Sequence, residues 1–498
     1  MTFNKTAAVL LGSVALASLA VPAFAQEAAP AAPEATASAD EQASEIEFLK
    51  AQLESMQAQI ADIQKQAKSN TPTFKGAPLF EDKEAGWSFK IRGRYMQDAA
   101  FISNPNDAVA GKNLGFNTKV RRARLGVEGT FPGDFGYKFE ADFANAGANS
   151  NIGFGDVILS WNPNKGPLTF IIGNHETFES LEQISSSRFV SFIERAQMND
   201  AFGHTRRLGM SVNFADKSNV LRFGAGLFSN HSIDQSFDND GWIGAARLTY
   251  SPQFAGGMLH LGANYQHREF QSNAQNIQYR ARPFLQTTDV RFVGTGTYAS
   301  KSDDIFGVEL AGIFGPLHGA AEAQWVKSNA YGRGDLVNTN GDLTGSTTVP
   351  GGDPSFFSWY AELGYFLTGE TRGYKNGMWD RTKVLNPVNK GGMGAFQINA
   401  RYDYLDLNDS KLQNGFTNNF STGVSSASVS LARGGKQTGY LLGLTWIPMD
   451  YVRFLVNYIH SDVEGGPFAA AVKPLSTKPV NERSYGVDAV AVRAQFDF

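Results

Sequence analysis

The sequence predicts an all-β chain, an antiparallel transmembrane β-barrel that follows a short N-terminal α-helical segment. Segments such as 119–131 and 137–143 alternate apolar with charged or small residues, which is the two-residue period of a strand. The long loop 174–209 interrupts this rhythm, and the alternation then continues to the last residue, Phe498. Alternation alone fits a soluble β-sandwich as well as a barrel whose charged face lines a water-filled lumen. The loop 174–209 is the feature that favours the barrel over the sandwich.

Composition narrows the class of protein. A chain of 498 residues can hold several soluble domains or one large barrel. Cysteine is absent, which excludes disulfide bonds and thiolate metal sites. No run of about 20 apolar residues follows the N-terminus, which excludes ordinary transmembrane helices. The net charge of −4 does not bear on lumen selectivity, which depends on local charge. We expect no nucleic-acid partner.

The N-terminus has the pattern of a secretory signal peptide over residues 1–25. Lys5 precedes an apolar core at 7–20, and Ala23-Phe24-Ala25 forms a small-residue cleavage site. A short buried helix is the alternative interpretation. Residues 26–43 are rich in Ala, Pro and Glu, a composition that predicts a disordered linker.

Residues 44–70 are predicted to form a periplasmic coiled coil. The gaps between apolar residues alternate between three and four, as in a heptad seam made by Ile46, Leu49, Leu53, Met56, Ile60 and Ile63. An isolated helix of this length is marginal in water, so we expect it to oligomerise. A single helix on the barrel's rim is the alternative. A tether to the cell wall, with peptidoglycan as a further partner, is compatible with either. Pro72 and Pro78 are expected to end the helix.

The barrel is predicted over 80–498, with a first strand beginning at Trp87. Polar insertions at 331–352 and 408–436 are expected to be extracellular loops. Because strand side chains alternate, the basic residues expected on the lumen face are Lys90, Arg92, Arg94, Arg122, Arg124, Lys138, Arg222, Arg247, Arg401 and Arg453. The alternative for each is a structural ion pair with an acid on a neighbouring strand. A last strand ending in Phe498 resembles the signal read by the barrel assembly machinery.

The loop 174–209 is the candidate functional element. It is too long for a hairpin turn, and its aromatic and aliphatic content argues against disorder. A loop folded into the lumen would narrow the pore at fixed positive charge, as an anion pathway requires. Arginine can bind an anion's oxygens bidentately, and hydroxyls can donate to it. The candidate pathway residues are Arg92, Arg94, Arg122, Arg124, Ser185, Ser186, Ser187, Arg188, Arg195, Arg206 and Arg207.

Several motifs occur together in order: RRARLGVEG, YKFEADFAN, SLEQISSSRFVSFIER and NDAFGHTRRLGMSV. Through them the sequence resembles the phosphate-selective porin O/P family. The resemblance implies about sixteen strands, a homotrimer, and a Gram-negative outer membrane with lipid and lipopolysaccharide around the barrel. It implies passive diffusion of small anions, phosphate or polyphosphate first, without a cofactor.

Two other functions remain open. Where the family often carries Lys followed by Pro-Phe, this chain reads HETFES at 175–180, and the acids Glu176 and Glu179 leave a general, weakly selective porin open. His175 and His204 invite a metal or acid–base interpretation, but no HExxH or comparable ligand set is present. A secreted β-rich glycoside hydrolase is the remote alternative. We expect neither enzymatic activity nor a metal.

Overall fold

The computed structural model describes residues 39–70, 72–74, 76–105, 109, 114–144, 152–233, 241–270, 276–331, 346–419, 424–429, 433–473 and 477–498. The predicted signal peptide and most of the predicted linker lie outside these residues. The chain divides into two units, Met1–Lys68 and Ser69–Phe498, and each is described by itself.

The first unit contains all but the last two residues of the helix α1 (Ala39–Asn70), which begins five residues before the predicted boundary and ends before Pro72. The described seam side chains Ile46, Leu49, Leu53, Met56 and Ile60 are each more than half exposed in the single chain. The side chain of Ile63 lies outside the described residues. Within the described part of the chain, none of the helices combines the length and apolar character needed to cross a membrane.

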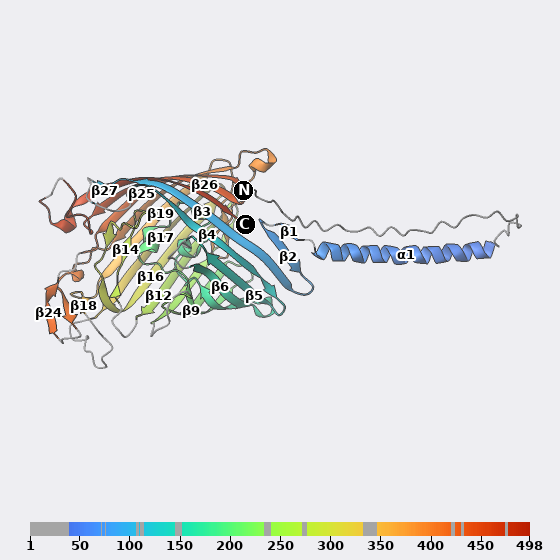
Figure 1. The fold of residues 1–498 in the computed structure, drawn as a ribbon, viewed down its shortest axis with the longest axis horizontal. Coiled ribbons are helices and arrows are strands. Elements are labelled where there is room, and N and C mark those ends of the chain that lie inside the picture. The colour runs from blue at the N-terminus through green and yellow to red at the C-terminus, as the bar shows by residue number, and fades with distance from the viewer. Residues whose placement is uncertain are drawn as a thin grey trace, which may run out of the picture. The chain divides into compact units, whose positions relative to one another are not determined.

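The second unit is a closed antiparallel barrel of sixteen strands, as predicted (Figure 1). The strands are β3 (Trp87–Ile102), β4 (Gly115–Phe131), β5 (Phe135–Asp142), β6 (Gly153–Trp161), β7 (Leu168–His175), β8 (Arg207–Ala215), β9 (Leu221–Ser229), β10 (Trp242–Tyr250), β12 (Gly257–Glu269), β16 (Tyr298–Phe314), β17 (Leu317–Ala330), β19 (Ser355–Phe366), β22 (Ala395–Asp406), β25 (Lys436–Met449), β26 (Val452–Glu464) and β27 (Ser484–Asp497). Each strand pairs with the next, and β27 pairs with β3 to close the ring.

The chain also forms shorter elements that are not among these sixteen strands. They are β1 (Thr73–Phe74), β2 (Pro78–Asp82), β11 (Gln253–Phe254), β13 (Asn276–Ile277), β14 (Arg280–Ala281), β15 (Val293–Gly294), β18 (Ser346–Val349), β20 (Gly373–Lys375), β21 (Met378–Asp380), β23 (Gly415–Asn419), β24 (Val424–Val429), α2 (Leu181–Ile184) and α3 (Gln197–Ala201). The described part of the chain also contains 3-10 turns at Pro163–Lys165, Val388–Lys390, Ser410–Leu412 and Val480–Glu482. The two predicted polar insertions meet, because β18 pairs with β23 in a small separate sheet.

The predicted alternation sets the two faces of the barrel wall. In β27, Val492 and Phe496 are 44% and 48% exposed on the outer face, whereas Arg493 and Gln495 are buried on the inner face. The alternation expected for 137–143 breaks at Ala141, which is buried beside Glu140. A β-bulge between Phe139 and Ala141 shifts the register there, and a bulge places two successive residues against one partner. The sequence pattern does not reveal this irregularity.

Long connections fill part of the lumen. The connection 176–206, between β7 and β8, carries α2 and α3, and it packs against the connection 276–297. Phe192 and Met198 of the first and Phe284 and Phe292 of the second belong to one buried hydrophobic cluster. The loop prediction is therefore confirmed in its placement: 176–206 folds into the barrel because its apolar side chains find a core there.

A second inward segment comes from the opposite end of the barrel, where most connections are short turns such as 132–134 and 450–451. The connection 367–394, between β19 and β22, contains the β20–β21 hairpin, and this hairpin contacts α2 in the lumen. The sequence analysis did not predict this segment.

Candidate functional site

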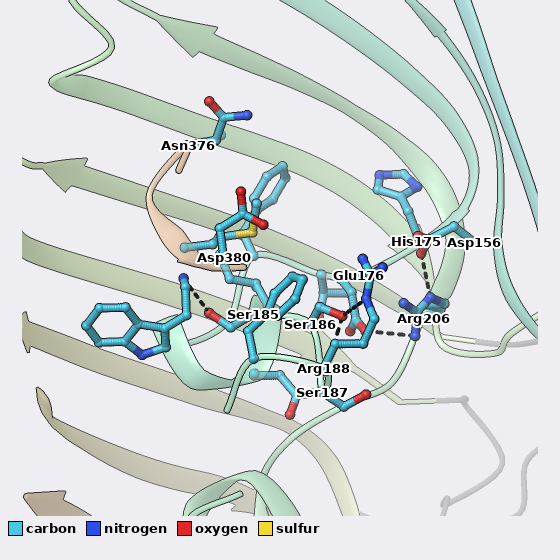
Figure 2. A pocket seen from close by; sticks show the side chains of 18 of the residues that line it. Asp156, His175, Glu176, Ser185, Ser186, Ser187, Arg188, Arg206, Asn376 and Asp380 are labelled. Carbon is cyan, nitrogen blue, oxygen red and sulfur yellow. Dashed lines mark hydrogen bonds and ion pairs between the residues drawn. The ribbon is translucent and has the colours of Figure 1, made fainter. Parts of the chain in front are cut away.

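A cavity of about 750 Å³ lies in the lumen between the wall and the two inward segments. Figure 2 shows side chains of loop 176–206 and of the β20–β21 hairpin converging on it. Eleven basic residues line it: Arg92, Arg94, Arg122, Arg124, Lys138, Arg188, Arg195, Arg206, Arg222, Arg247 and Lys375. Four acids line it: Glu128, Asp156, Glu176 and Asp380. The lining therefore carries an excess of positive charge.

Most predicted pathway residues meet in this cavity. Arg92, Arg94, Arg122, Arg124, Ser185, Ser186, Ser187, Arg188, Arg195 and Arg206 all line it. Arg207 does not; it is the first residue of β8, and its Nη1 lies 3.1 Å from both the Thr205 hydroxyl and the Arg206 carbonyl oxygen. The prediction that Arg207 belongs to the anion pathway gains no support from this cavity and stays a prediction. Sequence spacing identifies the inner face but not the depth of a residue at a loop–strand junction.

Wall carboxylates and an amide fix the backbone of loop 176–206. Both oxygens of Glu322 accept hydrogen bonds at the start of α2, from the backbone N–H of Leu181 at 2.7 Å and of Glu182 at 2.9 Å. The Asn457 side-chain oxygen accepts from the Ile193 N–H at 2.8 Å. Asp403 accepts from Gln197 N–H at 3.2 Å. Buried donors of the loop are thus satisfied by specific wall residues.

Wall arginines hold the loop's carbonyl groups and one of its acids. Arg493 donates to the Ile193 carbonyl at 2.5 Å, and Arg453 donates to the Val190 carbonyl at 3.1 Å. Arg401 pairs with Glu182 of the loop and, at 2.5 Å, with Glu362 of β19. Arg401 and Arg453 were expected on the lumen face and are found there, but their contacts anchor the loop.

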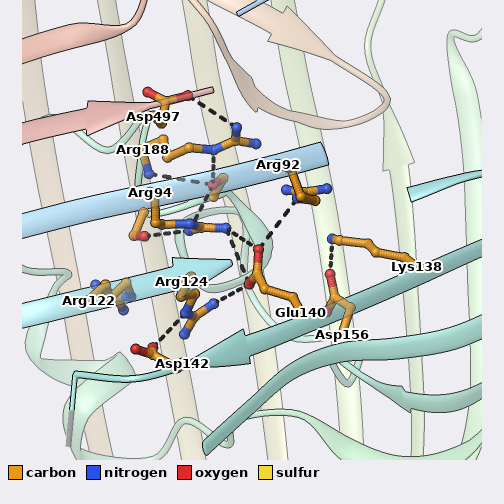
Figure 3. Close-up of polar contacts among 12 residues, drawn as sticks. Arg92, Arg94, Arg122, Arg124, Lys138, Glu140, Asp142, Asp156, Arg188 and Asp497 are labelled. Atoms are coloured by element: carbon orange, nitrogen blue, oxygen red, sulfur yellow. Dashed lines mark hydrogen bonds and ion pairs between the residues drawn. The ribbon is translucent and has the colours of Figure 1, made fainter. Parts of the chain in front are cut away.

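The arginines of β3 and β4 are largely paired (Figure 3). Glu140 accepts from Arg94 at 3.1 Å and from Arg124 at 2.7 Å, and it lies 3.5 Å from Arg92. Arg92 also pairs with Glu128. Here the alternative of structural ion pairs across strands is confirmed. Each acid cancels part of the field that these cations would exert on a passing ion.

The predicted serines and two loop arginines also have partners. Ser187 Oγ accepts from Arg94 at 3.0 Å, and Ser186 Oγ accepts from Arg188 at 3.1 Å. Ser185 Oγ accepts from the backbone N–H of Trp379 at 3.0 Å. Arg188 pairs with Asp497 at 3.2 Å, and Arg206 pairs with Asp156 at 2.5 Å and Glu176 at 2.9 Å. The serine triplet mainly orders the loop and the hairpin.

Arg122 and Arg195 differ from these paired cations. In Figure 3 Arg122 stands apart from the network around Glu140. Among the contacts found within the described residues, its guanidinium has Met96 Sδ at 4.0 Å and no carboxylate. Arg195 donates to two backbone carbonyls, those of Glu182 at 2.8 Å and Ser185 at 2.7 Å. Their positive charges are therefore not neutralised by a contacting acid.

These two arginines lie where the large cavity meets a second one of about 160 Å³. The second cavity is lined by Arg121 and Arg122 of β4, by residues of loop 176–206 that include the acids Glu194 and Asp200, and by Arg282, Phe284, Leu285 and Gln286 of the other inward connection. Both cavities are lined by Arg122, Gln183, Arg195 and Thr205, and we call these four residues the neck. Every neck side chain offers a hydrogen-bond donor, and none is acidic.

The two acids of the HETFES segment have different positions. Glu176 lines the large cavity and pairs with Arg206. Glu179 is not part of that lining; it is 4% exposed, and it accepts from the His204 N–H at 2.7 Å. Burial raises the pKa of Glu179 to about 8, and the nearby Glu176 carboxylate adds to the shift. A carboxyl with this pKa is largely protonated at pH 7, so Glu179 adds little negative charge.

The sequence analysis missed the β20–β21 hairpin, which contributes Lys375, Met378 and Asp380 to the cavity. Arg372, just before the hairpin, donates to the Phe189 carbonyl at 2.7 Å and so ties this segment to loop 176–206. A detectable signal was present: 367–394 is far longer than the other turns at its end of the barrel. Within the part of the chain that the structure describes, no group of three or more His, Asp or Glu residues could hold a metal ion.

Comparison with known proteins identifies the family. Residues 89–498 match the family model "Phosphate-selective porin O and P". An uncharacterized protein of Caulobacter vibrioides is 33% identical over 436 residues, which cover 86% of this chain and 77% of that protein. Porin O of Pseudomonas aeruginosa is 24% identical over 443 residues, 80% of this chain and 90% of that protein.

Solved porin structures are similar at lower identity. The outer membrane channel DcaP of Acinetobacter baumannii has 15% identity and a TM-score of 0.47, covering 84% of this chain and 99% of that one. The anion-selective porin from Comamonas acidovorans has 13% identity and a TM-score of 0.45, covering 83% and 100%. Because the family model matches nearly the whole barrel, residues 89–498, the chain belongs to the phosphate-selective porin O and P family and is an outer-membrane porin.

Proposed function

We propose that this porin lets small anions, phosphate or polyphosphate first, diffuse passively across a Gram-negative outer membrane. The observation that carries the proposal is the neck, where Arg122 and Arg195 join Gln183 and Thr205 without an acid. An anion at the neck can accept hydrogen bonds from two guanidinium groups. A cation there would meet two positive charges and no acid among the four neck residues; the nearest acids of the smaller cavity's lining are Glu194 and Asp200, which pair with Arg121 and Arg282.

The proposed route runs from the end with long loops through the smaller cavity to the neck, and then into the large cavity. In barrels of this kind the long loops are extracellular and the short turns periplasmic. Paired cations such as Arg94 and Arg124 give the large cavity a moderate positive field. The neck, with unpaired charge in a narrow space, would then set the ion preference.

Phosphate titrated against the chloride current in a planar bilayer tests the preferred solute. Block by phosphate in the millimolar range or below supports a phosphate site at the neck. Anion selectivity without block supports a general anion porin. Little ion preference and no block supports the general, weakly selective porin, and the proposal would then be withdrawn.

We also propose that α1 joins three copies of the chain. The supporting observation is the seam, whose side chains Ile46, Leu49, Leu53, Met56 and Ile60 are more than half exposed in one chain. Apolar seams of this spacing are stabilised by packing against the same seam of a partner helix. A tether to peptidoglycan is the second candidate for α1, and co-sedimentation of the full-length protein with purified cell wall would favour it.

The C-terminus and the outer wall suggest further partners. The backbone of Phe498 exchanges two hydrogen bonds with Gly93 of β3, at 3.1 Å and 3.0 Å, where the last strand meets the first. We propose that the barrel assembly machinery reads this terminal aromatic residue after export by the predicted signal peptide 1–25. Outward aromatic residues such as Trp325 and Tyr440 would contact lipid, including lipopolysaccharide.

A further inference from the structure

One part of the large cavity is apolar, although most of the residues that line the cavity are polar or charged. Ile158 of β6 and Ile171 of β7 line the cavity and are partly exposed to it. Ile184 and Phe178 of loop 176–206 and Met378 of the β20–β21 hairpin also line it. We call Ile158, Ile171, Phe178, Ile184 and Met378 the apolar patch.

The strand register places the patch directly beside the basic wall. Ile158 is paired with Lys138 on β5, and Lys138 is paired with Glu128 on β4, so all three stand in one row around the barrel. Ile171 of β7 is paired with Ser160 of β6, along the edge of β6 that does not pair with β5. Paired residues of neighbouring strands lie side by side on the same face. The cavity thus has a cationic sector on β3 to β5 and, beside it, an apolar sector at Ile158 and Ile171, which Asp156 of β6 and His175 of β7 border.

An inorganic anion gains nothing from the apolar sector. Phosphate and chloride are hydrated on all sides, and isoleucine side chains offer them neither charge nor hydrogen bonds. Both isoleucines are only half-buried, and each leaves apolar surface open to the cavity. An anion with a hydrocarbon body could place its charged group on the cationic sector and remove its apolar surface from water on the patch.

Resting on the proposed anion-conducting function, we propose that the large cavity, in contrast to the neck, accommodates amphipathic organic anions, such as aryl or alkyl phosphomonoesters and aromatic carboxylates, in preference to inorganic phosphate. The charged group would lie at the arginines of β3 and β4. The hydrocarbon body would lie against Ile158 and Ile171. A phenyl ring that covers the patch on one face should strengthen binding about tenfold.

The test compares two blockers with the same charged group. Phenylphosphate and inorganic phosphate are titrated separately against the chloride current of the full-length porin in a planar bilayer. We expect phenylphosphate to reach half-block at about a tenfold lower concentration. In the I158T/I171T variant the two half-block concentrations should become similar, while that of inorganic phosphate stays within about twofold. Threonine keeps the β-branched shape that strands favour, which helps the variant to assemble.

The matched control is I172T, on the same strand, because Ile172 is 56% exposed on the outer face. It should keep the wild-type ratio of half-block concentrations. Should I158T/I171T fail to assemble, a wild-type series decides: butylphosphate must block at lower concentration than methylphosphate. Equal half-block by phosphate and phenylphosphate in the wild type overturns this inference and leaves the anion channel intact. Absence of anion selectivity and of any block overturns the proposed function as well.

Discussion

The double substitution R122Q/R195Q removes both unpaired charges of the neck while keeping two polar side chains of similar reach. At 4 Å a unit charge attracts an anion by about 1 kcal/mol even in the dielectric of bulk water, and by more where water is partly excluded. Two charges therefore contribute at least about 2 kcal/mol. Because 1.4 kcal/mol corresponds to a tenfold change, anion occupancy of the neck should fall roughly 30-fold, and the anion-to-cation permeability ratio should fall by at least that factor because the repulsion of cations is lost as well.

The assay is the reversal potential across a planar bilayer at low ionic strength, since salt screens these charges over about 10 Å at 0.1 M. The matched control is R433Q; Arg433 does not line either cavity and donates to the Gln413 side chain at 3.0 Å. R433Q should leave the reversal potential unchanged. A wild-type reversal potential in correctly assembled R122Q/R195Q would refute the assignment of the neck as the filter.

Three further predictions follow from the same contacts. E176Q should raise anion preference, because it frees Arg206 from one of its two acids. E179Q should change the reversal potential at pH 7 little, since Glu179 is buried and mostly protonated. Equal effects of the two substitutions on the reversal potential would contradict the assigned positions of the two acids. R401M leaves Glu182 of the loop and Glu362 of the wall without their shared arginine, so the free energy of unfolding in detergent should fall by about 3–5 kcal/mol and the single-channel current should become noisier. An unchanged melting curve would argue against Arg401 as an anchor of the loop. Deleting residues 45–68 should leave single-pore conductance intact but lower the temperature at which oligomers dissociate on semi-native gels, and an equally resistant oligomer would argue against the coiled coil.

Strand faces were predictable from the sequence because alternation is a local property of extended backbone. The inner positions of Arg92, Arg122 and Arg401 followed from it directly. The partners of those residues did not, because pairing depends on register between strands far apart in the chain. Glu140, from another strand, neutralises Arg94, whereas no contacting acid neutralises Arg122, and no local pattern separates these two cases.

Loop placement was predictable from length and composition, but loop contacts were not. The apolar residues of 176–206 required a core, and the lumen supplies it. The contribution of 367–394 depended on a contact between the hairpin and α2 that joins distant segments. Glu176 and Glu179 are three residues apart in sequence, yet one lines the cavity and the other is buried behind it. Such differences in depth are set by tertiary packing.

The reversal potential of the purified, full-length porin in a planar bilayer under a KCl gradient reports directly whether the pore prefers anions. We predict a potential close to the chloride equilibrium potential, because the four neck residues include two guanidinium groups without a contacting acid. A potential near zero, or one on the potassium side, would contradict it.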